Sequence, residues 1–376
     1  MKKISMSIRV YLWLILLCLS ISAQDFKTMQ DGIEYAEMTR TIDKMPVKMN
    51  LLRLDLTKVR LDAVHALDSA IGTETVSSLA TRHGAVAAIN AGFFRLDKSI
   101  FAGDAAGILI INKEFYSESH NGRIALLIEN NLIRTIVSFE HQNITDFFET
   151  GGKTFAVGRN RERKNDDIVI YKSKFNRTTL TDDKGIEFFI KDNKVVNIFD
   201  QKGNNEIPQD GFIISASGKM REELMTLLQI GTRVVSFIKQ TSPTDSSKGT
   251  LFRTAEDITN GVPQLIKNGK IEITWEQEKS SKSFVETRHP RTAVAKLKDG
   301  KFMMITVDGR SETSAGINLQ NLAEILLELG ATDAMNLDGG GSTTMFLGGK
   351  IVNQPSDQTG ERKVGDAILV FPRKKR

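Results

Sequence analysis

The sequence has 376 residues, of which 40% are hydrophobic, and it holds 51 Lys and Arg, 46 Asp and Glu and a single Cys. This composition excludes a disordered chain, a collagen-like chain and a disulfide-stabilised scaffold. The net charge is +5. It favours a nucleic-acid partner only if the basic residues cluster in the folded part of the chain, so their positions must be considered first.

The first 23 residues have the pattern of a secretory signal peptide. Lys2, Lys3 and Arg9 precede an apolar run at residues 10–19, and small residues follow it. This run is shorter than the roughly 20 residues of a membrane-spanning helix. We therefore expect cleavage near Ala23, export to the periplasm or the extracellular space, and no transmembrane segment in the mature chain. An uncleaved anchor is the alternative.

Most of the excess positive charge lies at the two ends of the chain. Cleavage after residue 23 removes three basic residues and the only Cys, which leaves 48 basic against 46 acidic residues and no disulfide. Residues 373–376 form a basic tail, and residues 24–372 without it hold 44 basic and 46 acidic residues. Aromatic residues make up only 7% of the chain and do not interleave with a basic stripe. The sequence therefore predicts a solvated tail, with weak electrostatic contact to an anionic surface as the alternative, and no nucleic-acid partner.

Alternating apolar residues predict strands in the N-terminal third. The predicted elements are strands at residues 47–56, 59–64 and 85–89 and a short helix at 75–82. The last of these strands runs directly into Asn90-Ala91-Gly92-Phe93-Phe94. We expect Asn90 and Gly92 to line a pocket beside a stacking Phe93 ring, although two adjacent aromatics are also typical of a core.

Residues 105–250 are predicted to form many short strands separated by Gly, Asn and Asp turns. The mixed charge run at residues 159–167 is interpreted as a solvated loop rather than an anion site. No repeat, heptad run or convincing interdomain linker interrupts the chain. We therefore expect a single domain over residues 24–372, with the strands of residues 30–80 either integral to it or a small subdomain.

A strand–helix–strand pattern lies near the C-terminus. Residues 301–307 and 333–337 are predicted strands, and Leu residues at helical spacing between 319 and 329 predict a helix between them. Such a βαβ unit makes its two strands parallel, so their C-terminal ends point to the same edge of the sheet. Asp308 and Asp338 follow these ends, where open α/β sheets form their ligand crevice.

The run Asp338-Gly339-Gly340-Gly341-Ser342 holds three consecutive glycines. Glycine costs backbone entropy on folding, so such a run fits a backbone that must approach a ligand closely. Its N–H groups would form a nest for an anion, with the Ser342 hydroxyl assisting. The alternative is a tight turn into the next strand. No Lys-Ser or Lys-Thr pair follows, so the run is not a P-loop.

Two further segments place basic side chains beside polar ones. Arg288-His289-Pro290-Arg291-Thr292 holds two Arg residues, which bind phosphate oxygens bidentately, although a solvated basic strand edge is an alternative. Asp308-Gly309-Arg310 combines a carboxylate with a guanidinium, an arrangement that is also found in surface ion pairs.

Other classes of site have less support. The five His residues are scattered, and neither HExxH nor GxSxG occurs, which argues against a zinc site and an α/β-hydrolase nucleophile. The sequence requires no cofactor, although several Asp residues at the predicted crevice suit a hard divalent cation. The identity of any metal ion stays open.

Five motifs occur in order: Asn90-Ala91-Gly92-Phe93-Phe94, Arg288-His289-Pro290-Arg291-Thr292, Val307-Asp308-Gly309-Arg310, Asn336-Leu337-Asp338-Gly339-Gly340-Gly341-Ser342 and Glu361-Arg362. Together they resemble the phosphodiester glycosidase family, over a stretch from about Gly32 to Phe371. Thr343 stands where a second Ser is common and Ala295 where Gly is usual. The resemblance implies an α+β catalytic domain with a large mixed β-sheet core and flanking helices, to which the predicted C-terminal βαβ unit belongs.

The resemblance also implies hydrolysis of the glycosidic C1–O bond of a carbohydrate phosphodiester, such as a GlcNAc-1-phosphodiester. The sugar is released and a phosphomonoester remains on the other product. We expect the catalytic carboxylates to be Asp308, Asp338 and Glu361. The candidates for binding the substrate and its phosphate are Asn90, Gly92, Phe93, Arg288, His289, Arg291, Thr292, Arg310, Gly339, Gly340, Gly341, Ser342 and Arg362.

Two alternatives remain at this point. A metal-dependent phosphohydrolase would use the Asp cluster to hold a divalent ion and would cleave the P–O bond instead of the C1–O bond. A non-catalytic binder of phosphorylated surface glycans would keep the same pocket without turnover.

Overall fold

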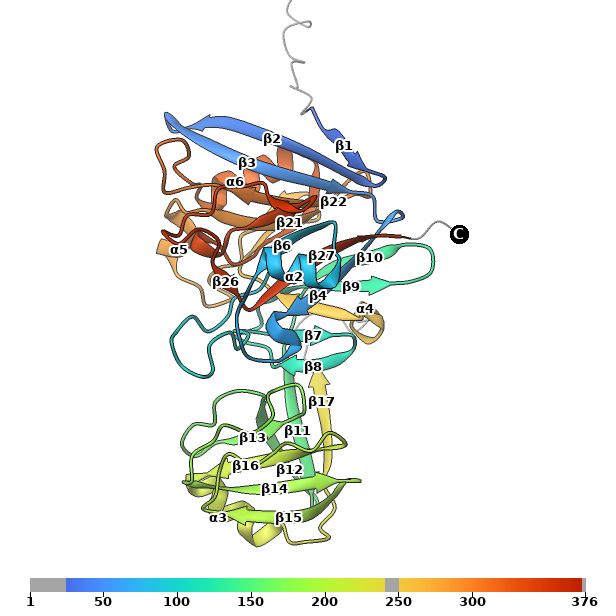
Figure 1. Ribbon diagram of the computed structural model, residues 1–376, viewed down its shortest axis with the longest axis vertical. Coiled ribbons are helices and arrows are strands. Elements are labelled where there is room, and N and C mark those ends of the chain that lie inside the picture. Colours follow the sequence, from blue (N-terminus) through green and yellow to red (C-terminus); the bar gives the residue numbers. More distant parts are fainter. Residues whose placement is uncertain (1–24, 241–249, 374–376) are drawn as a thin grey trace, which may run out of the picture.

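The computed structural model describes residues 25–240 and 250–373, so the expected signal peptide and the last three residues of the basic tail lie outside the described residues. Strands dominate, and they form sheets of eight, seven, five and five strands and one two-stranded pair within these ranges. Figure 1 shows the sheets following one another along the long axis of the molecule. None of the helices in the described part of the chain has the length and apolar character required to cross a bilayer.

The eight-stranded sheet combines the N-terminal strands with the C-terminal ones. In spatial order it contains β1 (Lys27–Gln30), β2 (Ile33–Ile42), β3 (Met45–Leu54), β22 (Phe302–Val307), β21 (Arg291–Leu297), β23 (Ala331–Asn336), β19 (Gln264–Lys267) and β20 (Lys270–Ile271). Each neighbouring pair is antiparallel. Because β3 pairs with β22, the first strands of the chain are integral to this sheet.

Helix α6 (Leu319–Glu328) covers one face of the eight-stranded sheet (Figure 1). The Asn318 side chain caps the helix by accepting a 2.8 Å hydrogen bond from the Asn321 N–H. The buried leucines of α6 recur at helical spacing and pack into one apolar core with β21, β22 and β23. The short helix α5 (Lys282–Glu286) packs against α6.

The opposite face of this sheet packs against a five-stranded antiparallel sheet. In spatial order the second sheet contains β25 (Lys350–Ile351), β24 (Met345–Leu347), β6 (Ala87–Asn90), β27 (Asp366–Pro372) and β4 (Val59–His65). Leu52 and Met304 from the first sheet share a buried cluster with Ile89 and Ile368 from the second. Helix α2 (Val76–His83) covers the outer face of the second sheet. The pair β5 (Glu74–Thr75) and β26 (Lys363–Val364) and the 3-10 turn η1 (Ala66–Asp68) lie at its margin.

The other five-stranded sheet lies beside this two-sheet core. In spatial order it contains β10 (Thr135–His141), β9 (Ile124–Asn130), β18 (Asp257–Asn260), β7 (Leu109–Ile111) and β8 (Glu114–Ser117), and α4 (Thr250–Thr254) contacts β9. Residues of β9 and β10 reach into the same buried cluster as the two larger sheets. This sheet therefore continues the core rather than forming a separate one.

Residues 144–240 form a lobe at one end of the molecule, drawn in green and yellow in Figure 1. In spatial order its sheet contains β15 (Lys194–Asp200), β14 (Gly185–Lys191), β16 (Gly211–Ser217), β13 (Ile168–Tyr171), β12 (Lys153–Arg159), β11 (Ile144–Thr150) and β17 (Val235–Gln240), with α3 (Gly218–Leu227). Phe148, Phe188 and Leu224 belong to a buried cluster confined to this lobe. The segment thus has its own core and interrupts the sheet formed by β9, β10 and β18.

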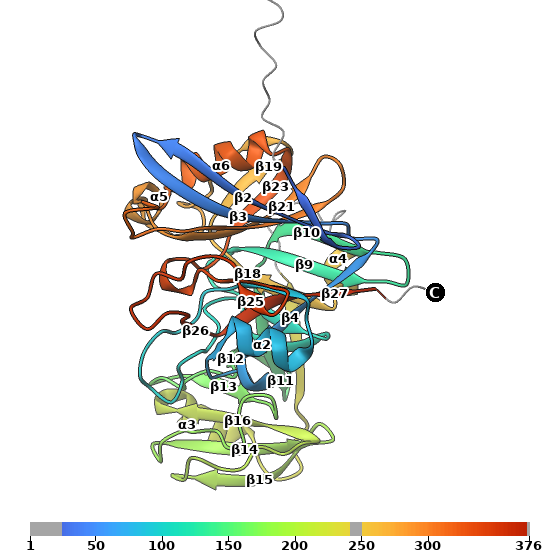
Figure 2. The same cartoon turned by 45° about the horizontal axis from the view of Figure 1, so that its top comes forward.

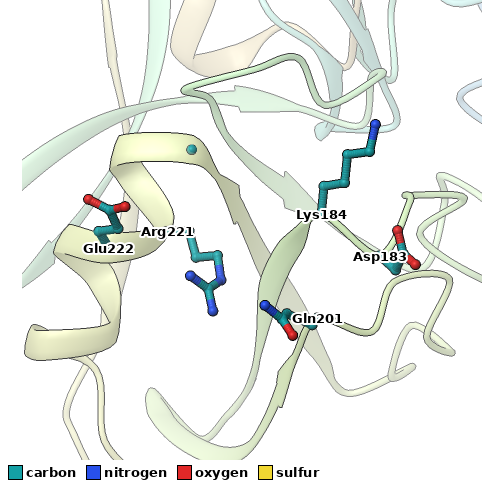
Figure 3. Close-up of a pocket in the computed structure, with 6 residues that line it drawn as sticks. Asp183, Lys184, Gln201, Arg221 and Glu222 are labelled. Carbon is teal, nitrogen blue, oxygen red and sulfur yellow. The ribbon is translucent and has the colours of Figure 1, made fainter.

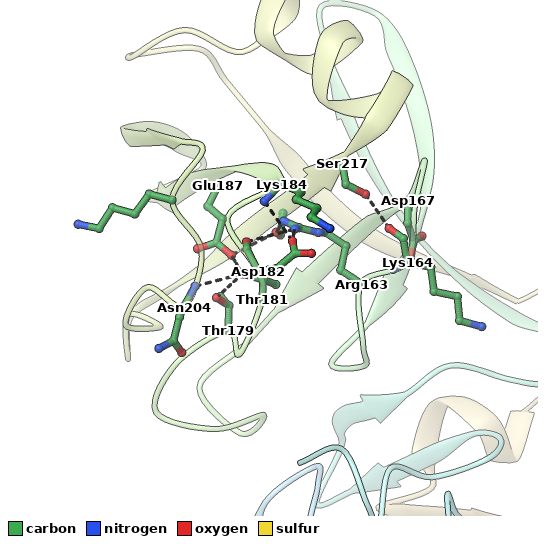
Figure 4. A network of polar contacts seen from close by, with 12 residues as sticks. Arg163, Lys164, Asp167, Thr179, Thr181, Asp182, Lys184, Glu187, Asn204 and Ser217 are labelled. Atoms are coloured by element: carbon green, nitrogen blue, oxygen red, sulfur yellow. Dashed lines mark hydrogen bonds and ion pairs between the residues drawn. The ribbon is translucent and has the colours of Figure 1, made fainter. Parts of the chain in front are cut away.

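A buried polar network also stabilises the lobe (Figure 4). The Glu187 carboxylate is fully buried and accepts hydrogen bonds from Thr181 Oγ1 at 2.7 Å and Ser215 Oγ at 3.1 Å. Arg163 donates to Ser215 and pairs with Asp182. A buried carboxylate is tolerated when its oxygens are satisfied in this way.

The interpretation of residues 159–167 as a solvated loop is wrong at its first residue. Arg159 ends β12, its side chain is only 2% exposed, and it forms an ion pair with the fully buried Asp146 of β11. Arg161 pairs with Glu118 and Asp167. Arg159 and Arg161 therefore form ion pairs within the fold, whereas residues 164–166 are exposed loop residues as predicted. A composition of mixed sign does not distinguish these two environments.

The structure is β-rich with a few helices, which agrees with the predicted α+β class. The strands are divided among several sheets rather than collected in one large mixed sheet. Among the described strands, β12 and β13 form the one directly parallel pair. β22 and β23 each pair antiparallel with β21, so they run in the same direction with β21 between them.

Candidate functional site

Asp308 and Asp338 lie at one edge of the eight-stranded sheet. Asp308 directly follows β22 and Asp338 comes two residues after β23. Because these strands run in the same direction, their C-terminal ends meet the same edge. β21 lies between these two strands, and it begins at the same edge, where Arg291 pairs with Val307.

A buried polar row connects this edge to the core between the two sheets. Asn50, Thr306 and Thr292 stand opposite one another on β3, β22 and β21. All three are less than 5% exposed, although their strands otherwise present apolar residues to this face. Thr292 Oγ1 donates a 2.8 Å hydrogen bond to Asn90 Oδ1 on the facing sheet. These three polar residues therefore mark the end of the apolar core, and Asp308 lies just beyond them, directly after β22.

Asp308 is the more buried of the two aspartates, with 5% of its surface exposed. Its carboxylate accepts a 3.0 Å hydrogen bond from the Gln354 N–H, and its carbonyl accepts a 2.6 Å bond from Ser314 Oγ. Burial raises the pKa of Asp308, while the Gln354 N–H opposes that effect. The carboxylate is thus fixed by a loop from the far end of the chain.

Asp338 is partly exposed and is held by backbone groups. Its Oδ1 accepts a 2.9 Å hydrogen bond from the Gly339 N–H, and its carbonyl accepts a 2.7 Å bond from Asn90 Nδ2. Loss of hydration is the main effect that raises the pKa of Asp338 to about 6, although Ser342, Gly339 and Arg362 act in the opposite direction. A carboxyl group with this pKa changes charge close to neutral pH, which is typical of functional sites.

The three glycines after Asp338 are required by close neighbours. A Cβ on Gly339 would lie 2.8 Å from the Pro290 carbonyl, and one on Gly340 would lie 3.0 Å from Arg310 Nη2. Gly340 also has a φ of +59°, and Gly341 would overlap the paired side chains of Asp357 and Arg362. The loop is therefore packed between Pro290 and two guanidinium groups.

Arg310 and Arg362 are the two guanidiniums against this glycine loop. Arg362 forms a bidentate pair with Asp357 at 2.6 and 2.9 Å. Arg310 is exposed, and its side chain makes a long contact of 3.4 Å to Ser356 Oγ. Its backbone has a φ of +60°, a conformation that costs energy for a residue with a side chain. The structure brings both side chains to the side of the Asp338 loop.

Arg288 and Arg291 are engaged elsewhere. Arg291 is 1% exposed and donates to the carbonyls of Phe284, Thr287 and Ile317 at 2.6 to 3.2 Å. Burial lowers its pKa to about 10. Arg288 pairs with Asp43.

Arg291 thus satisfies carbonyls at the end of α5, and Arg288 donates to the carbonyls of Ile42 and Gly316. The structure therefore brings neither guanidinium to the Asp338 loop. His289 exchanges two backbone hydrogen bonds with Ile317. Burial and the charges of Arg291 and Arg310 lower the pKa of His289.

The segment from Asn90 to Phe94 links the two sheets. Asn90 is fully buried, and its amide contacts Thr292, the Thr344 N–H and the Asp338 carbonyl. Gly92 has no room for a side chain, because its Cβ would lie 2.7 Å from Asn260 Nδ2. The Phe93 ring is half-buried and packs edge-on against Phe284 with ring centres 6.0 Å apart. Asn90 and Gly92 therefore position the loop.

Glu361 points to helix α2. Its two carboxylate oxygens accept hydrogen bonds from the Ser77 N–H at 2.8 Å and Ser77 Oγ at 2.5 Å. Ser77 lies in the first turn of α2, where the helix dipole favours a negative charge. Both oxygens are thus engaged at the helix N-terminus.

Two further carboxylates, which no sequence motif indicated, lie in the same region. Asp357 pairs with Arg362, as described above. Asp366 opens β27, is 2% exposed, and accepts a 2.7 Å hydrogen bond from Thr259 Oγ1. Burial raises the pKa of Asp366 to about 7, and the charge of Asp338 adds to that effect. An acidic residue that begins an otherwise apolar strand is the sequence signal that would have identified it.

Across residues 25–240 and 250–373, no three His, Asp or Glu side chains form a group suited to a metal ion. A divalent cation at the Asp cluster therefore stays a prediction. A cavity of about 410 Å³ opens elsewhere, in the lobe, and Figure 3 shows its charged lining. The lining residues are Asp183, Lys184, Gln201, Gly218, Arg221 and Glu222. Arg221 already pairs with Asp200, and the signs of charge are mixed, so this cavity is a poor anion site.

The fold and the site define a β-rich protein with two carboxylates and two guanidiniums at one sheet edge. A model of the phosphodiester glycosidase family matches residues 184–371, which is half of the chain. The chain therefore belongs to the phosphodiester glycosidase family.

Named relatives match over shorter segments. The chain is 31% identical over 160 residues to the N-acetylglucosamine-1-phosphodiester alpha-N-acetylglucosaminidase of Mus musculus, which covers 40% of this chain and 30% of the relative. The Homo sapiens enzyme of the same name is 31% identical over 153 residues, or 38% of this chain and 28% of that enzyme. The chain thus spans less than a third of these relatives.

A solved structure from Synechocystis superposes with a TM-score of 0.79 at 22% identity, covering 93% of this chain and 64% of the other. One from Burkholderia pseudomallei superposes with a TM-score of 0.75 at 22% identity, covering 87% of this chain and 74% of the other. At this identity the likeness shows the fold alone.

Proposed function

We propose that the protein hydrolyses the glycosidic C1–O bond of a sugar-1-phosphodiester and releases the sugar from a phosphomonoester. The observation that carries the proposal is the partly buried Asp338, whose pKa is raised to about 6 and whose glycine loop packs against the guanidiniums of Arg310 and Arg362. Family membership and the likeness to N-acetylglucosamine-1-phosphodiester alpha-N-acetylglucosaminidases support the substrate class. A GlcNAc-1-phosphodiester is the corresponding first substrate to test.

Arg310 and Arg362 bind the phosphodiester in this proposal. Guanidinium groups bind phosphate oxygens through charged N–H bonds, and their charge stabilises the negative charge that develops on the leaving group. Arg362 already donates from Nε and Nη2 to Asp357, so it contributes its charge and its remaining Nη1 group. Gly340 and Gly341 let both side chains approach the Asp338 loop. Arg288, His289, Arg291 and Thr292 contribute by fixing the start of β21, because their contacts lie within the scaffold.

The aspartates act on the sugar in this proposal. Cleavage of C1–O leaves positive charge at C1, and an ionised Asp338 stabilises that charge and accepts a proton from water or attacks C1 itself. A phosphodiester leaves readily, so protonation of the departing oxygen matters less than in ordinary glycosidases. Asp308 is the second carboxylate, and Glu361 supports the site through α2.

We also propose that the protein acts outside the cytoplasm, where its partner is a carbohydrate phosphodiester as a small molecule or on a surface glycan. The apolar run after Lys2, Lys3 and Arg9 supports export.

A release assay tests the proposed activity. The protein is incubated with a GlcNAc-1-phosphodiester, and free GlcNAc and phosphomonoester are measured. We expect both products in equal amounts, and at least a hundredfold loss of turnover in Asp338→Asn and Asp308→Asn with an unchanged thermal transition. Full activity of both variants would contradict the assigned carboxylates, and ligand binding without any release would favour the non-catalytic alternative.

A further inference from the structure

The turn between β9 and β10 exposes two large apolar side chains. Leu132 is 82% exposed and Ile133 is 78% exposed, more than any other large hydrophobic residue in the described ranges. Tight turns normally carry Gly, Asn, Asp or Ser at such positions, because polar side chains are hydrated there. A single exposed apolar residue needs no explanation, but an adjacent pair at a projecting tip does.

The turn itself does not require these apolar side chains. Asn131 Oδ1 accepts hydrogen bonds of 2.9 Å from the N–H groups of both Ile133 and Arg134, and the Asn131 N–H donates to the Arg134 carbonyl at 3.1 Å. Asn131 thus forms the turn through its own side chain. Leu132 and Ile133 fill only the outward positions, where a polar residue would fold equally well.

The C-terminal strand ends against this tip. The Arg373 guanidinium donates to the carbonyl of Asn131 at 2.7 Å, to Thr135 Oγ1 at 2.9 Å and to the carbonyl of Val59 at 3.1 Å. Arg373 was expected to belong to a solvated tail, and it instead fixes the end of β27 to the turn. Both figures of the whole molecule show β27 running to the corner from which the β9–β10 hairpin projects (Figures 1 and 2).

Basic side chains surround the apolar tip. Arg134 and Arg60 are exposed, and Arg60 stacks over the Phe371 ring at 5.3 Å. The sequence continues after Arg373 with three more basic residues, Lys374-Lys375-Arg376. Acidic neighbours are also present: Asp62 pairs with Arg60, Glu256 lines the hollow beside the tip, and Glu129 precedes Asn130 in the same hairpin. A hollow of about 760 Å³ between tip and strand end is lined by Thr57, Arg60, Asn130, Asn131, Leu132, Ile133, Glu256, Phe371, Pro372 and Arg373.

We propose that this corner, formed by the turn at residues 131–134, Arg60 and Arg373, docks on an anionic lipid surface. Exposed aliphatic side chains enter the boundary between headgroups and acyl chains, and flanking Arg residues are attracted to anionic headgroups. A polysaccharide would satisfy the charge but would give Leu132 and Ile133 no apolar surroundings. The combination therefore favours lipid over an anionic glycan.

The docking corner lies apart from the candidate site. In Figures 1 and 2 the hairpin projects to the right, whereas α5 and β26, which flank the site, lie on the left. Variants at the tip are therefore expected to leave turnover of a soluble substrate unchanged. This separation makes the docking test independent of the proposed catalytic activity.

Co-sedimentation of the full chain with vesicles tests the proposal. We expect binding to vesicles of phosphatidylcholine with about 30% phosphatidylglycerol, weaker binding as salt rises, and little binding to pure phosphatidylcholine. The double variant Leu132→Ser with Ile133→Ser is expected to bind at least about tenfold more weakly. Its thermal transition is expected to stay unchanged, since both side chains are exposed.

Ile230→Ser is the matched control, because Ile230 is 70% exposed but lies in the lobe and should not affect binding. Absence of binding to the anionic vesicles at low salt would overturn the proposal. So would equal binding by the wild type and the double variant, or capture by an anionic polysaccharide combined with indifference to vesicles.

Discussion

The Asn90 side chain donates a 2.7 Å hydrogen bond from Nδ2 to the main-chain carbonyl of Asp338, a residue 248 positions later in the chain. The same amide accepts hydrogen bonds from Thr292 Oγ1 and the Thr344 N–H through Oδ1. One buried side chain therefore joins both sheets to the loop that carries the candidate catalytic carboxylate. The position of Asp338 depends on this amide.

Asn90→Asp is expected to lower the free energy of unfolding by about 2–4 kcal/mol and to abolish activity. The new carboxylate cannot donate to the Asp338 carbonyl, and it places an unpaired charge in a fully buried position. Urea unfolding of both proteins at pH 7 measures the change. Asn197→Asp on the exposed face of β15 is the control and should change little. A fully stable, active Asn90→Asp variant would refute this role.

Asp366→Asn is expected to stabilise the protein at high pH. The pKa of Asp366 is about 7 in the folded state against 3.8 for an ordinary Asp, so the folded state binds the proton more tightly than the unfolded state does. Folding stability due to this group is therefore complete below pH 4 and is lost as pH rises towards 7. The amide keeps an acceptor for Thr259 without the charge.

We compare the free energy of unfolding of Asp366→Asn with that of the wild type. The advantage of the variant is expected to increase by about 2–4 kcal/mol between pH 4 and pH 8. Urea unfolding at several pH values gives this difference. Asp210→Asn, at an exposed surface ion pair, provides the comparison and should show no such rise. A difference that is independent of pH would show that Asp366 ionises normally.

Gly341→Ala is expected to lower kcat/KM by about a hundredfold or more. The added Cβ overlaps Asp357 and Arg362, so the bidentate pair must move away from the Asp338 loop. Gly349→Ala is a useful control, because Gly349 has a φ of +89° but open space around it. That control should cost about 1–2 kcal/mol of stability with no loss of activity. Equal activity of the two variants would argue against a role for Arg362.

Arg310→Asn is expected to reduce kcat/KM by about a hundredfold at unchanged stability. Asn tolerates the left-handed backbone at this position, so the substitution removes the guanidinium without adding strain. Arg177→Asn serves as the matched variant, since the Arg177 side chain is 83% exposed in the lobe. If both variants kept wild-type kinetics, the phosphate would have to bind elsewhere.

The pH dependence of kcat/KM is expected to follow the ionisation of Asp338. Since the pKa of Asp338 is raised to about 6 and the ionised form is proposed to act, activity should increase with pH through about 6. Initial rates from pH 4.5 to 8 measure this profile. A decrease through the same range would instead indicate that Asp338 acts as an acid.

Sequence periodicity was sufficient to bring Asp308 and Asp338 to one edge, because parallel strand direction follows from a strand–helix–strand order. It could not show that β21 lies between their strands, since strand order depends on long-range pairing. The sequence also could not predict which groups Arg291 contacts. Its partners are main-chain carbonyls of Phe284, Thr287 and Ile317, which carry no residue-type signal.

The additional core within residues 144–240 was missed for a similar reason. Its short strands were predicted, but a separate buried cluster becomes visible only once the strands pair. Asp366 was overlooked because an acidic residue beside an apolar strand resembles an exposed strand end until its burial is known.

Hydrolysis in ¹⁸O-labelled water tests the central claim most directly. The GlcNAc-1-phosphodiester is hydrolysed completely, and both products are analysed by mass spectrometry. Cleavage of C1–O places the label on the anomeric oxygen of the sugar and leaves the phosphomonoester unlabelled. Label in the phosphate would show P–O cleavage and would contradict the proposed glycosidase.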